Sequence, residues 1–226
     1  MLHGQNKEYK CKINLESRCI RLCFFPPVLQ FTTGISLQFN GVTNEGLHVL
    51  CPALKPFVNL MALDLAANGI VLTPAETARP LLSELAAAFG ALPRLQRLNL
   101  SGIRMRECVP AVLGAVGRPL SMLRLSGCGL RRSDLVWLAS AAVSSQLEQL
   151  DIGANNLAPH VDAVCRILYH AGRTLTVFEA EDADLTPVAI GVLLSTFAEL
   201  PQLRFEYTLL FHVSDLDFNF STNMRN

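Results

Sequence analysis

The sequence predicts an α/β leucine-rich-repeat solenoid of about six repeats, with a curved parallel sheet on the concave side and helices on the convex side. Two observations predict this fold. Leucine or isoleucine recurs at fixed offsets, and the segments between these leucine-rich stretches contain residues typical of helix starts. The clearest pair is LSMLRLSGCGL, which begins at Leu120, and LEQLDIGANNL, which begins at Leu147, 27 residues later. One such unit cannot bury its apolar side alone, so neighbouring units are expected to stack and share a core.

The template LxxLxLxxNxL fits six segments of the chain. They begin at Thr32, Leu60, Leu95, Leu120, Leu147 and Leu175. Their middle apolar residues are separated by 28, 35, 25, 27 and 28 residues, and these residues are Leu37, Leu65, Leu100, Leu125, Ile152 and Ala180. Such intervals are typical of leucine-rich repeats, with an insertion of about seven residues in the second unit.

Helix-start signals follow the predicted strands. Thr73 and Pro74 offer an N-cap and a first-turn proline, and Glu76 completes a capping box before LLSELAAAFGAL. Thr186 and Pro187 repeat this arrangement before VAIGVLLSTFAEL. We therefore expect one helix in each repeat, packed on the sheet.

The two ends of the chain do not fit the template. We divide the chain into a non-repeat segment over residues 1–30, a leucine-rich-repeat domain over 31–205 and an irregular tail over 206–226. When LPQLRFEYT is aligned with LPRLQRLNL, Glu206 and Thr208 fall at leucine positions. A fragment or alternative product of a longer parent would explain both ends.

The composition argues against several classes of partner and location. Lysine plus arginine and aspartate plus glutamate both number 19, so no charge excess predicts binding to nucleic acid or to an anionic membrane. No apolar run approaches the roughly 20 residues of a membrane span, and residues 1–15 lack the apolar core of a secretory signal. We expect a cytoplasmic or nuclear protein.

The cysteines predict neither a disulfide framework nor a cofactor. The chain has seven, an odd number, without CxxC pairs. Cys11, Cys19 and Cys23 lie close together, but their spacings fit no standard zinc pattern. We expect reduced cysteines, no metal and no cofactor.

The residues between the strand leucines are the candidate binding residues, because alternate side chains of a strand point to opposite faces. The central outward row reads Ser36, Asp64, Asn99, Arg124, Asp151 and Glu179, the row before it contains Ala62, Arg97, Met122, Gln149 and Val177, and the row after it contains Ser101, Ser126, Gly153 and Glu181. From these we select, as residues that bind a protein client on the concave face, Asp64, Arg97, Asn99, Met122, Arg124, Gln149, Asp151, Glu179 and Glu181. The alternative is an ordinary solvated sheet face on which the arginines pair with the aspartates across strands.

Other conspicuous residues allow a structural interpretation. Asn40, Asn68 and Asn155, with Cys128 in the equivalent place, are expected to hydrogen-bond the loop backbone from inside the stack. Trp137, the single tryptophan, is either an interface anchor or a ring packed between helices. Cys165 precedes a histidine by five residues, which places the two on different helix faces.

No catalytic motif is present in the sequence. The chain contains no P-loop, no HExxH, no GxSxG and no dinucleotide-binding glycine pattern. We therefore expect a protein that is not an enzyme.

The region from 60 to 205 resembles the PRAME family of leucine-rich-repeat proteins and their relatives. The matching elements are the CGL at 128–130, a following helix, the SQL at 145–147 and the ANNL turn at 154–157. This resemblance implies a substrate-recognition adaptor of a cullin and elongin ubiquitin ligase, with elongin and cullin subunits as partners. Leu15 and Cys19 begin a match to the elongin-binding box, but Cys23 replaces its last aliphatic residue. The alternative function is a stand-alone inhibitor or sensor that occludes a signalling partner.

Overall fold

The computed structural model describes residues 31–75, 79–140 and 146–199. Strands and helices alternate along it. In order they are β1 (Gly34–Ser36), α2 (Asn44–Leu54), β2 (Ala62–Asp64), α3 (Arg79–Gly90), β3 (Arg97–Asn99), α4 (Val109–Leu113), β4 (Met122–Arg124), α5 (Arg132–Leu138), β5 (Gln149–Asp151), the 3₁₀ helix η2 (Ala158–His160), α7 (Val161–Ala171), β6 (Val177–Glu179) and α8 (Pro187–Ala198).

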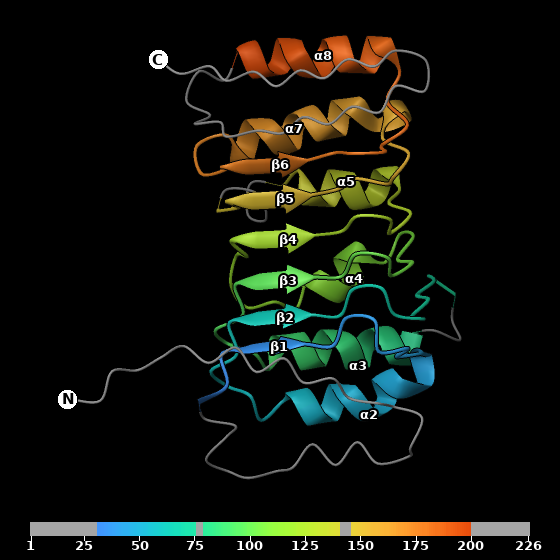
Figure 1. Cartoon of the computed structure of the whole chain (residues 1–226), viewed down its shortest axis with the longest axis vertical. Helices are drawn as coiled ribbons and strands as arrows, with labels where there is room; N and C mark the ends of the chain where they lie inside the picture. Colours follow the sequence, from blue (N-terminus) through green and yellow to red (C-terminus); the bar gives the residue numbers. More distant parts are fainter. Residues whose placement is uncertain (1–30, 76–78, 141–145, 200–226) are drawn as a thin grey trace, which may run out of the picture.

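The six strands form one parallel sheet in sequence order from β1 to β6, as Figure 1 shows. Across this sheet the first residues of the strands lie side by side: Gly34, Ala62, Arg97, Met122, Gln149 and Val177. This is the register that the repeat template predicts, and the six-repeat solenoid is confirmed.

The helices of consecutive repeats pack on one another from α2 to α8, which lie at opposite ends of the stack in Figure 1. Packed helices stand about 8–10 Å apart, whereas paired strands stand about 4.8 Å apart. Because the helical layer is the wider one, the sheet lies on the inner, concave side of the curve. Its outward side chains therefore form the face that the sequence predicts as the docking face.

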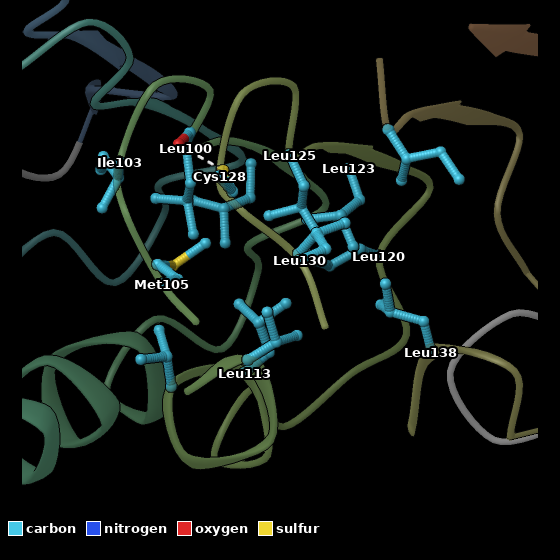
Figure 2. Close-up of a cluster of buried hydrophobic side chains, with 14 of the residues drawn as sticks. Leu100, Ile103, Met105, Leu113, Leu120, Leu123, Leu125, Cys128, Leu130 and Leu138 are labelled. Carbon is cyan, nitrogen blue, oxygen red and sulfur yellow. Dashed lines mark hydrogen bonds between the residues drawn. The ribbon is translucent and has the colours of Figure 1, made fainter. Parts of the chain in front are cut away.

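The core lies between the sheet and the helices. The central residues of three neighbouring strands, Leu98, Leu123 and Leu150, are no more than 1% exposed. Figure 2 shows Leu125 in the same cluster as Leu138 of α5. Burying one such leucine contributes roughly 1.5–3 kcal/mol, so the leucines at the repeat positions hold the stack together.

Each strand leads into a turn with one residue in the left-handed region. That residue stands at the same place in all six repeats: Phe39 (φ 57°), Ala67 (52°), Gly102 (79°), Gly127 (66°), Ala154 (49°) and Asp182 (52°). Only two of the six are glycine, so packing of neighbouring turns imposes this geometry even where a side chain makes it unfavourable.

One predicted helix start is confirmed and one is wrong. Thr186 caps α8, and its hydroxyl accepts a hydrogen bond from the Ala189 amide at 3.2 Å. In contrast, α3 begins at Arg79, and Pro74 lies in a bend. The segment before Pro74 is still tied to the next repeat, because the amide of the fully buried Leu72 donates to the carbonyl of Arg104 at 2.7 Å.

Candidate functional site

The nine predicted binding residues all lie on the side of the sheet that no described helix covers, which we call the sheet face. It comprises the first and third residues of each strand and the second residue after each strand. Arg97 and Glu181 are exposed, and the other seven candidates are half-buried. The strand register brings them into adjacent rows, as the sequence predicts. That they bind a partner stays a prediction.

A hollow of about 230 Å³ divides these candidates into two groups. It lies over β1 to β4, and five of the nine candidates line it: Asp64, Arg97, Asn99, Met122 and Arg124. Gln149, Asp151, Glu179 and Glu181 belong to β5, β6 and the turn after β6, outside this hollow. The sheet face therefore has a hollowed part toward β1 and a second part toward β6.

Three candidates of the central row are bound to their own turns. The side-chain Oδ1 atoms of Asp64, Asn99 and Asp151 accept hydrogen bonds from the amides two residues later, at 2.9, 3.1 and 3.0 Å. These are Asx turns, in which a short polar side chain replaces a backbone acceptor. Asp64, Asn99 and Asp151 therefore stabilise the turns as well as face the solvent, a role that the sequence prediction missed.

The pKa of the Asp151 side chain, the third of these, is shifted by its surroundings. Burial raises the pKa of its carboxyl above the usual value, and the charge of Glu181 adds to this, while the Gly153 amide and the charge of Arg124 act in the opposite direction. Gly153 is itself buried, and a Cβ at that position would lie 2.7 Å from the carbonyl oxygen of Glu181. The sheet face at Gly153 is closed by the neighbouring turn.

Arg97 and Arg124 are the basic residues of the hollow. Within the part of the chain that the structure describes, neither forms an ion pair with Asp64 or Asp151. The charge of Arg124 nevertheless acts on Asp151 of the neighbouring strand, so the alternative of charge pairing across strands stays open. Met122 lies beside Arg97 in the strand register and shares its face with Arg124, two residues later. Two guanidinium groups that form no ion pair with another described residue thus flank one apolar side chain.

The opposite charge gathers at the other end of the sheet face. Glu179, Glu181, Asp182 and Asp184 follow one another on β6 and the turn after it. In the described ranges none of the four forms an ion pair with another described residue. The sheet face is therefore basic over β3 and β4 and acidic over β6.

Two of the three predicted asparagines, Asn68 and Asn155, hydrogen-bond the turns from inside the stack as the sequence predicts. Asn40 is only half-buried, and its amide donates to the Gln38 carbonyl at 2.9 Å. Asn155 is 2% exposed, and its amide nitrogen donates to the carbonyls of Leu125, Ile152 and Gly153 at 2.9, 2.9 and 2.8 Å. Asn68 makes the equivalent set of bonds in the second repeat. These side chains join consecutive turns and are not available to a partner.

Asp134 is a buried acid that the sequence prediction missed. Its carboxylate accepts the amides of Glu107, Val109 and Arg131 at 2.9, 3.1 and 2.9 Å. Burial raises its pKa, and the three backbone donors oppose that shift. Its position three residues after Arg131 is that of a capping-box acid, and this spacing could have identified it.

The remaining candidates have structural surroundings. Trp137 is partly buried against the core and lines a cavity of about 190 Å³ formed mainly by the segment between α4 and β4, which favours packing over an interface anchor. The Cys165 sulfur accepts the Thr196 hydroxyl at 3.1 Å, whereas the His170 ring packs edge-on against Tyr169.

The described ranges contain neither a candidate metal site nor a candidate membrane span. No group of three or more histidine, cysteine, aspartate or glutamate residues there could hold a metal ion. In those same ranges, no helix has the length and apolar character needed to cross a bilayer. Cys11, Cys19 and Cys23, together with the partial elongin box, lie outside the described residues.

Comparison with known proteins gives several related sequences, although no family model matches the chain. Leucine-rich repeat-containing protein 14 of Xenopus laevis is 34% identical over 125 residues, which cover 55% of this chain and 25% of that protein. The protein of the same name from Mus musculus is 25% identical over 173 residues, which cover 76% of this chain and 35% of that protein. Human NACHT, LRR and PYD domains-containing protein 13 is 34% identical over 161 residues, which cover 67% of this chain and 15% of that protein.

The chain thus spans about a quarter to a third of the length of the proteins named leucine-rich repeat-containing protein 14. Those proteins are members of the PRAME family, which is consistent with the resemblance of the CGL and ANNL elements. The relatives and the six stacked strand and helix units together show a leucine-rich-repeat protein, a class of protein-interaction scaffold.

Proposed function

We propose that this leucine-rich-repeat protein binds an extended segment of a client protein on its sheet face, with acidic side chains of the client over Arg97 and Arg124. The observation that carries the proposal is the hollow over β1 to β4, in which neither arginine forms an ion pair with another described residue.

The chemistry of the hollow specifies the client. Arginine presents a planar fork of donors that matches a carboxylate, so the two guanidinium groups favour aspartate or glutamate in the client. Met122 between them offers a flexible apolar contact. At the β6 end, Glu179 and Glu181 favour lysine or arginine in the client. A client segment with acidic and basic residues at separate positions fits both ends of the sheet face.

An exposed parallel sheet supports a binding role. Parallel sheets ordinarily have both faces covered, whereas the described helices all lie on one face of this sheet. A client segment would cover part of the open face, and we propose that this contact, and not catalysis, is the activity of the chain.

We further propose that the bound client is presented to a cullin and elongin ubiquitin ligase, and that the protein acts in the cytoplasm or the nucleus. The resemblance to the PRAME family and the box that begins at Leu15 and Cys19 support the ligase role. Residues 1–30 would then contact elongin while the sheet face holds the client.

Charge reversal tests the client site. The double variant Arg97→Glu and Arg124→Glu should recover less client from cell extract than the wild type, and a matched control is Arg94→Glu with Arg173→Glu. Both control residues are exposed in the turns before β3 and β6, away from the hollow. The loss should shrink as salt rises, since exposed charges are screened over about 8 Å at physiological ionic strength. Equal recovery by the two double variants would place the client elsewhere.

Removal of residues 1–30 tests the ligase role separately. The full chain should recover elongin or cullin subunits together with the client, and the shortened chain should recover the client alone. A full chain that recovers a single partner and no ligase subunit would support the stand-alone inhibitor or sensor instead.

A further inference from the structure

An apolar cavity lies behind β4, where the helical layer is short. The interval from Leu100 to Leu125 is 25 residues, the shortest of the repeat intervals. Its helix α4 has five residues, whereas α3 has 12 and α7 has 11. At 1.5 Å per residue, α4 is about 8 Å long and α3 about 18 Å. The chain returns from α4 to β4 through turns and bends over residues 114–120, and this segment lines a cavity of about 190 Å³.

Buried leucines line the inner part of this cavity, and exposed turn residues line its outer part. Leu120, Leu123 and Leu147 are at most 7% exposed, and Figure 2 shows the first two in one buried cluster. Gly117 and Arg118 line the same cavity and are exposed. The cavity therefore leads from the core to the edge of the sheet at which the strands begin.

This cavity is separate from the hollow on the sheet face. Met122 and Arg124 of β4 line the hollow, whereas Leu123 between them lines the cavity. Since alternate side chains of a strand point to opposite faces, β4 divides the two spaces. A group bound in the cavity would leave the client site on the sheet face open.

Two polar groups at the cavity have no partner among the described residues. Arg118 is a charged residue of the lining and forms no ion pair with another described residue. The indole N–H of Trp137, which belongs to the cavity wall, likewise has no hydrogen-bond acceptor in the described ranges. Both donors favour an anionic oxygen. The occupant that fits therefore has an apolar group for the leucines and a carboxylate for Arg118.

The size of the cavity indicates that its occupant is part of a larger molecule. Sites that bury a whole ligand of drug size have volumes of about 300–1,000 Å³, whereas an apolar cavity of about 150 Å³ holds a group the size of benzene. We propose that the cavity receives one apolar side chain of a protein partner, with an aspartate or glutamate of the same partner over Arg118. Side chains seated in pockets in this way contribute much of the binding energy of protein interfaces.

Trp137 fluorescence tests this proposal, because Trp137 is the single tryptophan of the chain and lines the cavity. The peptide acetyl-Glu-Phe-Glu-amide, added to the full chain at millimolar concentration, should change this fluorescence to saturation. Acetyl-Glu-Ala-Glu-amide should bind at least about tenfold more weakly, since it has no large apolar side chain to bury. Acetyl-Lys-Phe-Lys-amide should also bind more weakly, because Arg118 repels it. Equal binding of the three peptides, or no binding, would overturn the proposal.

Variants of the lining locate the bound peptide. Val116 lines the cavity at a half-buried position, and Val116→Phe should fill the cavity and abolish the fluorescence change. Val58→Phe is the matched control, since Val58 is exposed in the turn before β2. Arg118→Glu should weaken binding of the glutamate peptide by about fivefold and strengthen binding of the lysine peptide. This exposed change decides the question even where Val116→Phe fails to fold. Unchanged binding in Arg118→Glu would contradict the proposal.

The double variant Arg97→Glu and Arg124→Glu separates this cavity from the client site. It should bind the glutamate peptide as the wild type does, whatever its effect on the client. Loss of peptide binding in this variant would place the peptide on the sheet face and contradict the inference. A fluorescence response to toluene but none to the peptide would show a cavity closed to a protein partner, which would contradict it as well. Failure of the client site leaves the peptide results intact.

Discussion

The turns at Asn155 and at Cys128 both accept a hydrogen bond from a backbone amide of the preceding turn, but with different acceptor atoms. At Asn155 the side-chain oxygen accepts the amide of Leu130 in the preceding turn at 3.0 Å. At Cys128 the side chain has no oxygen, and the backbone carbonyl of the same residue accepts the equivalent amide, that of Met105, at 2.9 Å. The amide of the earlier turn is thus satisfied in both cases, although by different groups.

The two turns also differ in how they bind a backbone carbonyl of the preceding repeat. The Asn155 side chain donates to the Leu125 carbonyl at 2.9 Å, and the Cys128 sulfur contacts the Leu100 carbonyl at 3.2 Å, the contact drawn in Figure 2. The Leu100 carbonyl also accepts the amide of Ile103 at 3.1 Å. The asparagine turn therefore depends on its side chain, whereas the cysteine turn is already bonded through the backbone.

The largest expected effect comes from Leu125, which precedes the Cys128 turn and whose carbonyl accepts the Asn155 side chain. Leu125 is fully buried, and Leu125→Asp would place a carboxylate in the core without a partner. We expect it to lower the free energy of unfolding by at least about 4 kcal/mol and to disrupt both turns together. Thermal melting against Ser126→Asp, which changes the next residue on the sheet face, checks this. Equal melting temperatures would contradict the inward and outward assignment.

The second prediction concerns the asparagine turn itself. Asn155→Ala would leave the buried Leu130 amide and Leu125 carbonyl without their partners, at about 1–3 kcal/mol for each unsatisfied group. We expect a loss of about 2–4 kcal/mol in urea unfolding. Asn156→Ala is the matched control, since Asn156 is exposed. A loss no larger than that of the control would mean that the backbone carbonyl can replace the asparagine here too.

The sequence predicts the strand register better than it predicts the turns. The register follows from burial: a shift of one residue would turn Leu98 and Leu123 to the solvent, so the leucine spacing has one solution. The turn before α3 contains a contact with the next repeat, the hydrogen bond from the Leu72 amide to the Arg104 carbonyl. Local capping patterns do not include such contacts between distant residues.

The candidate binding residues show the same limit. Alternation along the strands predicts that Asp64, Asn99 and Asp151 face outward, and they do so at half-buried positions. It does not predict that their side chains bind their own turns, because an Asx turn depends on local backbone geometry. Which residues of the sheet face are free for a client follows only from these contacts.

The third prediction tests the hydrogen bonds that the Asp134 carboxylate accepts from the backbone. Asp134→Asn retains one acceptor oxygen but points an amide group at backbone donors that the carboxylate now accepts. We expect a loss of about 1–3 kcal/mol, less than at Asn155 because part of the bonding remains. The control is Asp162→Asn, whose carboxylate is exposed and paired with Arg132. Chemical unfolding of both variants checks this, and a larger loss in the control would contradict it.

The smallest effect is expected at the cysteine turn. Cys128→Ala removes a weak sulfur donor and a small buried volume, and the amide of Met105 keeps its backbone acceptor. The Leu100 carbonyl likewise keeps the amide of Ile103. We therefore expect a loss of about 1 kcal/mol or less, well below that of Asn155→Ala. Urea unfolding of the two variants in one buffer measures the difference directly. A loss at Cys128 as large as that at Asn155 would show that the thiol bonds the turn as strongly as the amide does, and that the backbone carbonyl of Cys128 does not compensate.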